Sequence, residues 1–329
     1  MFYQSGEPYQ LEEETYAGMI PDDIPWVAVT GFGAHLKATP VRLVIQHNGK
    51  VQEYPIRKIP HLLIIGGHTL HSSVVKTLVK NGIPISFFDA DGTPAGVIRP
   101  YGDTRDTVMR SLQINAPKHR YAVSIAKGSL QSRLLFLQKL GESRESPLLY
   151  DGELQFLHKA YDELEYLIKL DEIRRLHRLT TDMYYEIISR TTPPELGYRR
   201  RAARVRQDPV NAMLSLGYAM LHGSCMVPVL ASRFDPDLGL LHEGPGSLIS
   251  DIIDPFRAEM VDAAVLRIAA AGIAPSDYEL SAERCLLSDD LVLQLQSAVK
   301  TTIQPVRIQE QVQILTGALC DGSSFIVLS

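Results

Sequence analysis

Residues 234–262 read FDPDLGLLHEGPGSLISDIIDPFRAEMVD, and within this stretch the composition changes from that of a turn to that of a helix. An Asp-Pro pair and three glycines favour a turn first, and the apolar run that follows favours a helix. His242 lies just before the predicted helix, and Asp251 and Asp254 lie three residues apart within it. Residues at that spacing share a helical face, so the stretch predicts a histidine close to two acids.

An imidazole nitrogen and carboxylate oxygens form a partial ligand shell for Mg²⁺ or Mn²⁺, which keep waters and accept phosphate oxygens as further ligands. The residues also suit a structural role. Asp254 precedes Pro255, and an Asp-Pro pair is a standard start of a helix. In that interpretation Asp251 is simply solvated and His242 makes an ordinary hydrogen bond.

Helical periodicity extends on both sides of this stretch, from about residue 104 to the end of the chain. Apolar residues from Ile173 to Ile187 recur in steps of three and four, which is the spacing of a buried helix face. Asp208 followed by Pro209 is a typical helix start. The tail from residue 281 predicts two weaker helices.

Residues 26–100 have the pattern of a β-rich segment with one helix. Two β-branched runs meet at Asn48-Gly49, a hairpin signal, and a second turn is expected at Asp91-Gly92. Between them, apolar residues at helical spacing predict a helix that begins at the N-cap Thr69 and stops at Gly82.

The chain as a whole reads as an α+β protein of two domains. Its 329 residues are 45% hydrophobic and 22% charged, an ordinary globular composition. We predict a β-sandwich-like domain with one helix, together with a linker, over residues 1–103, and a larger all-α domain over residues 104–329. Three distant cysteines, no secretory signal and no uncharged apolar run of membrane length predict a cytoplasmic protein without membrane association.

Charge is distributed unevenly along the chain. The net charge is −5, and residues 142–172 hold nine acids against three bases, so the rest of the chain carries +1. We expect this acidic stretch to form a helix that faces solvent or a partner and stays away from DNA.

Five arginines and no acid fall within residues 198–206, YRRRAARVR. They are Arg199, Arg200, Arg201, Arg204 and Arg206. Guanidinium groups match phosphate geometry, so this segment predicts contacts to a DNA backbone. A solvated connection between two helices is the other interpretation.

His177 is a further candidate, at the edge of the apolar face of a helix predicted over about residues 172–189. From this window alone, a boundary histidine with a structural hydrogen bond is the simpler interpretation. The sequence contains no phosphate-binding loop of the GxxxxGK[ST] type, no GxSxG nucleophile motif and no HExxH zinc motif.

The order of these segments resembles the CRISPR-associated protein one family, the integrase-nuclease of CRISPR adaptation. The resemblance is collinear over about residues 26–320. It is carried by IPHLLIIGGHTLHSSVVKTLVKNGIPISFFDADGTPAGVIRP, by DPVNAMLSLGYAML and above all by the stretch FDPDLGLLHEGPGSLISDIIDPFRAEMVD. It implies a β-sandwich followed by a helical domain, a homodimer, assembly with CRISPR-associated protein two, and a divalent metal held by a glutamate, a histidine and an acid.

By position, the family's histidine falls on His242 and its acidic ligand on Asp254, with Asp251 beside it as a further candidate metal ligand. The glutamate in the family pattern L-R-G-I-E-G-x-A-A-x-x-Y-F falls on His177, within the run IRRLHRLTTDMYY of residues 173–185. The resemblance therefore implies that His177, His242 and Asp254 are the catalytic, metal-binding residues. This set has one negative charge where the family has two, which suits Mn²⁺ or a softer cation better than Mg²⁺.

The activity implied by the resemblance is that of a DNA integrase and endonuclease dependent on Mg²⁺ or Mn²⁺. It joins a DNA 3′-hydroxyl to a phosphodiester of repeat DNA without a covalent protein intermediate. The departures at His177 and Asp254 are equally consistent with a catalytically attenuated relative that binds DNA as a structural or assembly subunit. An unrelated metal hydrolase of small phosphoesters fits the site residues but leaves the arginine segment unexplained.

Overall fold

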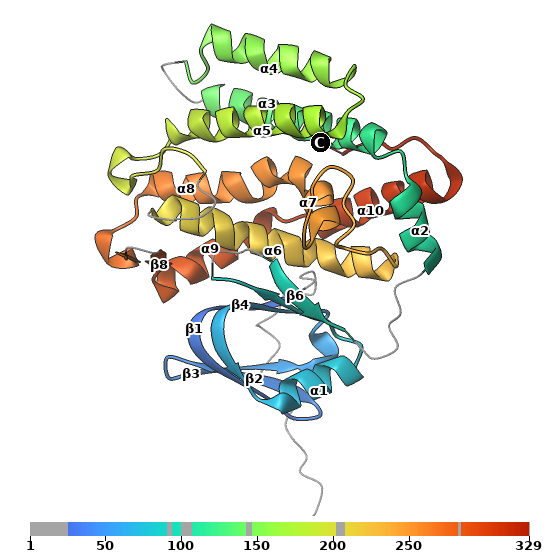
Figure 1. Ribbon diagram of the computed structural model, residues 1–329. Coiled ribbons are helices and arrows are strands. Elements are labelled where there is room, and N and C mark those ends of the chain that lie inside the picture. The colour runs from blue at the N-terminus through green and yellow to red at the C-terminus, as the bar shows by residue number, and fades with distance from the viewer. Residues whose placement is uncertain are drawn as a thin grey trace, which may run out of the picture.

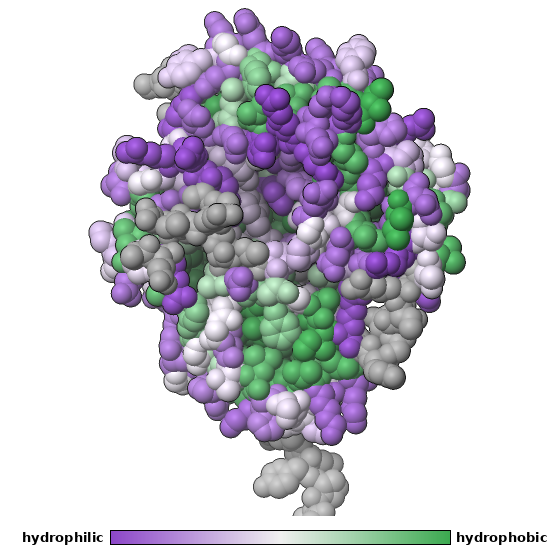
Figure 2. All heavy atoms as spheres, viewed as in Figure 1, coloured by the Kyte–Doolittle hydropathy of each residue, from purple (hydrophilic) through white to green (hydrophobic). Residues whose placement is uncertain are grey.

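A computed structural model describes residues 26–90, 94–99, 107–142, 147–201, 208–281 and 284–328. A β-sheet lies at one end of the molecule, and layers of helices are stacked on it (Figure 1). In the same view, hydrophilic residues cover most of the helical layers, while an apolar area lies over the sheet (Figure 2). The turn predicted at Asp91-Gly92 and the arginines at positions 204 and 206 lie outside the described residues.

Six strands form one mixed sheet in the order β3-β2-β1-β4-β5-β6. Their bounds are β1 (Val27–Ala38), β2 (Arg42–His47), β3 (Lys50–Pro55), β4 (Leu62–Leu70), β5 (Ile85–Phe88) and β6 (Pro94–Ile98). Strands β1, β4 and β5 are parallel, and the outer strands pair antiparallel to their neighbours. The predicted sandwich is therefore wrong for the described residues, which form a single sheet here. Helices cover its two faces in place of a second sheet.

Local signals in the sheet domain give mixed outcomes. The hairpin at Asn48-Gly49 is confirmed, with φ values of 48° and 73° at its two central residues. Helix α1 (Ser72–Lys80) ends before Gly82, whose φ of +75° suits the predicted stop. Its N-cap is His71, however, because strand β4 continues through the position predicted for the cap, Thr69.

The helical part contains nine helices within the described residues. They are α2 (Thr107–Asn115), α3 (Lys118–Glu142), α4 (Asp151–Leu164), α5 (Leu170–Ser189), α6 (Pro209–Ala231), α7 (Ser247–Ile253), α8 (Ala263–Ala271), α9 (Asp289–Thr302) and α10 (Pro305–Asp321). A small ribbon, β7 (Tyr278–Leu280) and β8 (Cys285–Leu287), interrupts them, so the prediction of an all-α domain is incomplete. The two helices predicted in the tail are confirmed as α9 and α10.

The acidic stretch contains the whole of α4, the helix farthest from the sheet (Figure 1). Asp151, Asp162 and Glu163 are exposed, as expected for a solvent-facing helix. Glu153 instead forms an ion pair with Arg190, 2.5 Å from Oε1 to the guanidinium, which ties α4 to the end of α5.

Helix α6 lies between the sheet and the other helices. By length and composition it could cross a membrane, but 78% of its most apolar window is buried inside the protein, as in the core helix of a globular domain. It begins as predicted, because Asp208 accepts a hydrogen bond from the amide of Asn211 at 2.7 Å and Pro209 occupies the first turn. Gly223 lets the sheet approach closely, since a Cβ there would lie 2.4 Å from Leu63. Sheet and helices thus share one hydrophobic core.

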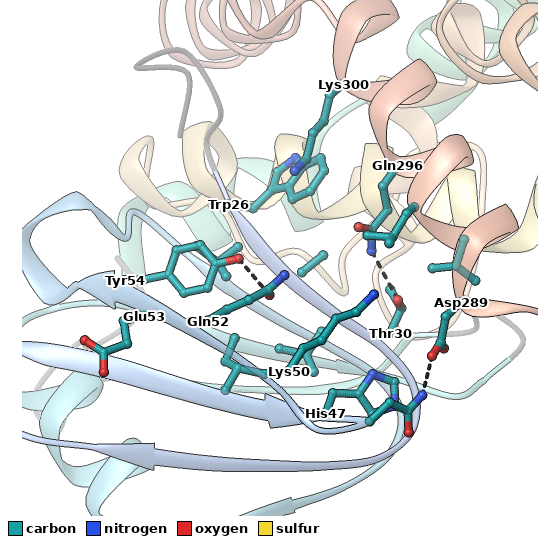
Figure 3. Close-up of a pocket in the computed structure, with 17 residues that line it drawn as sticks. Trp26, Thr30, His47, Lys50, Gln52, Glu53, Tyr54, Asp289, Gln296 and Lys300 are labelled. Atoms are coloured by element: carbon teal, nitrogen blue, oxygen red, sulfur yellow. Dashed lines mark hydrogen bonds between the residues drawn. The ribbon is translucent and has the colours of Figure 1, made fainter. Parts of the chain in front are cut away.

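A cleft of about 270 Å³ opens between the sheet and α9 (Figure 3). Lys50 and Gln52 on β3 face Gln296 and Lys300 on α9. The side-chain amide of Gln296 donates to Thr30 Oγ1 at 3.1 Å, which links the two walls. None of the residues predicted for catalysis lines this cleft.

Two buried histidines lie where the sheet meets α6. His61 is 0% exposed and pairs with Ser86 Oγ at 2.9 Å through Nε2. His222 is 4% exposed, its ring packs edge-on to Phe88, and neither of its nitrogens has a hydrogen-bond partner within the described residues. Burial lowers the pKa of His61 to about 4 and the pKa of His222 to about 3.

Acid should therefore destabilise the fold through His61 and His222. Below the unfolded-state pKa of about 6.5, the unfolded chain binds protons that the folded chain does not. Each histidine then lowers the free energy of unfolding by ~1.4 kcal/mol per pH unit as the pH falls from 6.5 toward its folded pKa. Urea unfolding at pH 7, 6 and 5 should show a shallower pH dependence for His222→Leu. Equal slopes for the variant and the wild type would contradict this account.

Candidate metal and catalytic site

Segments that are far apart in the chain meet around Asp254, which is 1% exposed. It opens a 3-10 turn, Asp254–Phe256, at the end of α7. Side chains from α3 and α5 reach it, and the loop between α6 and α7 brings His242 alongside. A one-turn π-helix, Ala258–Asp262, follows and leads into α8.

Three side chains hydrogen-bond to the Asp254 carboxylate, and a fourth forms an ion pair with it. Oδ1 accepts from Arg133 at 3.0 Å and lies 3.0 Å from the guanidinium of Arg257. Oδ2 accepts from Ser129 Oγ at 2.5 Å and lies 2.7 Å from His177 Nε2. Burial disfavours the charged form, but the two guanidiniums and His177 outweigh it and hold the pKa of Asp254 well below its usual value. The carboxylate therefore binds side chains of other helices instead of capping its own.

His177 is buried on α5 and faces Asp254. Burial lowers the pKa of His177, although Asp254 opposes that shift. Because an ionised carboxylate only accepts hydrogen bonds, the neutral imidazole must carry its proton on Nε2. The position thus differs from the simple boundary histidine of the sequence window, since its partner is a buried acid 77 residues away.

His242 is oriented by Asp251. Its Nδ1 lies 2.8 Å from Asp251 Oδ1, and the same carboxylate accepts the backbone N–H groups of Leu240, Leu241 and His242 itself. Asp251 was expected beside Asp254 as a ligand, but its oxygens are directed at the loop. The hydrogen bond from Nδ1 leaves Nε2 of His242 as the nitrogen that can bind a cation.

Arg174 holds the His242 loop against α5. Its Nε donates to the carbonyl of Leu241 at 2.7 Å, and its guanidinium pairs with Glu243 at 2.7 Å. The rings of His177 and His242 consequently lie 5.5 Å apart and nearly perpendicular.

One ligand atom from each of His177, His242 and Asp254 lies within 4.8 Å of the others. Two imidazole nitrogens and one carboxylate oxygen form a donor set that suits divalent transition metals. A cation bound here must replace the hydrogen bond between His177 and Asp254. The other partners of Asp254 stay in place. The residues therefore fit a divalent cation in kind and in spacing, and the single carboxylate disfavours a hard ion such as Mg²⁺.

Ser129 and Arg133 are site residues that sequence reasoning missed. The sequence around them predicts only an amphipathic helix. Arg133 nevertheless lies on the same helical face as Leu130 and Leu137, and a charge on an apolar face was the available signal. In the structure the Arg133 side chain is 2% exposed.

A second buried carboxylate, Asp262, lies near the site and binds two tyrosines. It accepts hydrogen bonds from the hydroxyls of Tyr184 at 2.7 Å and Tyr218 at 2.5 Å. Tyr185 pairs in turn with Tyr218 at 2.7 Å. Because these tyrosines belong to α5 and α6, the network fixes the helix that carries His177.

The described arginines of this segment differ in their surroundings. Arg199 and Arg200 are exposed. Arg201 instead donates to Asn211 Oδ1 and Ser215 Oγ, both at 3.0 Å, so its guanidinium is tied to α6. Its predicted contact to DNA stays a prediction.

The sheet, the helices stacked on it and the histidine–aspartate cluster occur in a chain that matches a known protein family. The family model described as CRISPR associated protein Cas1 matches residues 27–300. The chain belongs to the Cas1 family, so the resemblance stated from its motifs is confirmed.

Individual relatives agree with this assignment. The chain is 36% identical over 299 residues to a CRISPR-associated endonuclease Cas1 homologue of Methanospirillum hungatei, covering 91% of this chain and 99% of the relative. A casposase bound to integration product has the same fold, with a TM-score of 0.78 at 18% identity over 92% of each chain. A Cas6-RT-Cas1–Cas2 complex matches with a TM-score of 0.82 at 19% identity, over 94% of this chain and 37% of that one.

Removing the Asp251 carboxylate should destabilise the loop that carries His242. Asp251→Ala leaves three backbone N–H groups without their acceptor, so the free energy of unfolding should fall by at least ~2 kcal/mol. Glu243→Ala is the matched control, because that carboxylate is exposed and its loss should cost at most ~1 kcal/mol. Urea denaturation at pH 7 measures both, and equal losses would show that the loop does not depend on Asp251.

Proposed function

We propose that this chain is a divalent-metal-dependent DNA nuclease and integrase that joins a DNA 3′-hydroxyl to a phosphodiester of repeat DNA. The observation that carries the proposal is the convergence of His177, His242 and Asp254 within 4.8 Å in a member of the Cas1 family. The endonuclease names of the relatives and the integration product of the casposase support it.

The protein's contribution is to hold and orient the ligands. His177, His242 and Asp254 would bind the ion, which when bound would stabilise charge on the scissile phosphate as a Lewis acid. Asp251 keeps the Nδ1 proton of His242 in place, so that Nε2 faces the cluster. The His242 side chain is 28% exposed and forms the side of the cluster open to a substrate. We assign Mn²⁺ before Mg²⁺, because imidazole nitrogens outnumber the carboxylate.

Partners follow from the same assignment. We propose that Arg199 and Arg200, together with the arginines at 204 and 206, contact DNA phosphates and contribute affinity without reading sequence. We further propose that the chain forms a homodimer and assembles with Cas2. A matching solved structure that contains both Cas1 and Cas2 supports the latter.

A second candidate function is that of a DNA-binding structural or assembly subunit with an attenuated site. The observation that favours it is the state of Asp254, the one carboxylate of the cluster, which is already bound by two guanidiniums. Such a subunit would keep its salt-dependent DNA binding and lose metal-dependent strand transfer.

Strand transfer should depend on the metal and on Asp254. With purified chain and Cas2, a protospacer-like duplex should be joined to a repeat-containing plasmid in Mn²⁺, and less efficiently in Mg²⁺. Asp254→Asn removes the anionic ligand and should lower the rate at least ~100-fold. Asp182→Asn, an exposed aspartate on α5, is the matched control and should leave the rate unchanged.

His177→Glu separates the two candidate functions. If the wild type is silent and the variant is active, the native site is attenuated and the structural role is supported. If neither protein makes product with Mg²⁺ or Mn²⁺, the catalytic proposal fails.

Salt dependence tests the arginine segment. Each phosphate contact on duplex DNA contributes about −0.9 to the slope of log K against log salt concentration. The double variant Arg199→Gln/Arg200→Gln should therefore flatten that slope by up to ~1.8 in a fluorescence anisotropy titration. Arg57→Gln, an exposed arginine in the sheet domain, serves as control. A slope that does not change in the double variant would mean that these arginines face away from the DNA.

A further inference from the structure

The charge around Asp254 is unusual for a cation site. Two guanidiniums, those of Arg133 and Arg257, bind the same oxygen of the one carboxylate that belongs to the cluster. Of the other nearby acids, Asp251 directs its oxygens at the amides of the His242 loop, and Asp262 accepts from the hydroxyls of two tyrosines. The ligand cluster therefore has positive charge beside it before any metal ion arrives.

Arg133 is held in this position by further contacts. Its second terminal nitrogen donates to Thr181 Oγ1 at 2.7 Å, and its guanidinium carbon lies 5.6 Å from the centre of the Tyr184 ring. Thr181 donates in turn to the carbonyl of His177 at 2.7 Å. The guanidinium is thus built into the helix that carries one of the ligands, and it cannot leave Asp254 without breaking these contacts.

Arg257 contacts the same oxygen and an aromatic ring. Its guanidinium carbon lies 5.2 Å from the centre of the Tyr218 ring, and its side chain is 20% exposed. Tyr218 donates to Asp262, so the ring is itself anchored. Both cations therefore contact Asp254 and also a ring of the buried tyrosine network.

We infer that Arg133 and Arg257 compete with a divalent cation for the Asp254 carboxylate and thereby determine which cations the site accepts. The inference rests on the proposed metal function. A cation with high affinity for imidazole keeps its bonds to His177 and His242 when the carboxylate is shared. Mg²⁺ depends on oxygen ligands, and the arginines compete for the one carboxylate that the cluster offers it. The two arginines are specificity-determining residues that select against Mg²⁺.

Direct metal binding tests this inference without an activity assay. Mn²⁺ is titrated into the full chain at pH 7.5 and free Mn²⁺ is followed by its electron paramagnetic resonance signal, with Mg²⁺ as competitor. Arg133→Gln and Arg257→Gln should each bind Mn²⁺ about tenfold more tightly, because one repelling charge is removed beside the ligands. Mg²⁺ should compete more effectively in both variants than in the wild type.

The control is Arg190→Gln, which removes a guanidinium from another arginine–carboxylate pair, that with Glu153, away from the cluster. It should bind Mn²⁺ with wild-type affinity. An equal gain in this control would overturn the inference, because the effect would then be one of net charge. Arg257→Gln decides the matter if loss of the buried Arg133 prevents folding.

The inference and the proposed function fail in different ways. If Arg133→Gln or Arg257→Gln folds and binds Mn²⁺ no better than the wild type, the selectivity inference is wrong while the metal site stands. If the wild type binds Mn²⁺ and Asp254→Asn binds it equally well, the ion lies elsewhere and the proposed site is wrong.

Discussion

A single buried carboxylate, Asp254, joins the parts of this molecule that form its candidate site. It accepts hydrogen bonds from Ser129 and Arg133 on α3 and from His177 on α5, and it forms an ion pair with Arg257 just beyond its own turn. Breaking a buried ion pair by removing one partner leaves an uncompensated charge and commonly costs about 3–5 kcal/mol. The helices can therefore assemble only in an arrangement that satisfies this acid, and that arrangement brings the two histidines together.

Helix α6 packs against both the sheet and the loop next to the same site. Gly223 allows close contact with Leu63 on one side, while His222, one residue earlier, packs against the loop that leads into α7. There the close approach requires Gly246, because a Cβ would lie 2.5 Å from His222 Nε2 and the backbone has a φ of +65°. One helix thus connects the sheet to the loop that carries His242, which explains why the sheet and the helices share a hydrophobic core.

The structural role of Asp254 conflicts with its proposed role as a metal ligand. The donors that stabilise the buried charge are the groups that a metal ion must compete with.

The architecture of the sheet also depends on tertiary packing. The hairpin at Asn48-Gly49 was predictable because its φ values depend on the two residues themselves. The expected sandwich was wrong because no single strand indicates that helices pack on both faces of the sheet.

The sequence by itself determined several elements and the family. The turn before α7 and the start of α6 at Asp208-Pro209 are local signals, and the order of the motifs along the chain identifies Cas1. It also named His177, His242 and Asp254, which the structure brings within 4.8 Å. Only the tertiary structure decided the partners of those residues. Asp251 orients a loop, Arg201 is tied to α6, and Arg133 lies against Asp254. Hydrogen bonds between residues 9 to 121 positions apart depend on how helices pack and leave no periodic signal in the chain.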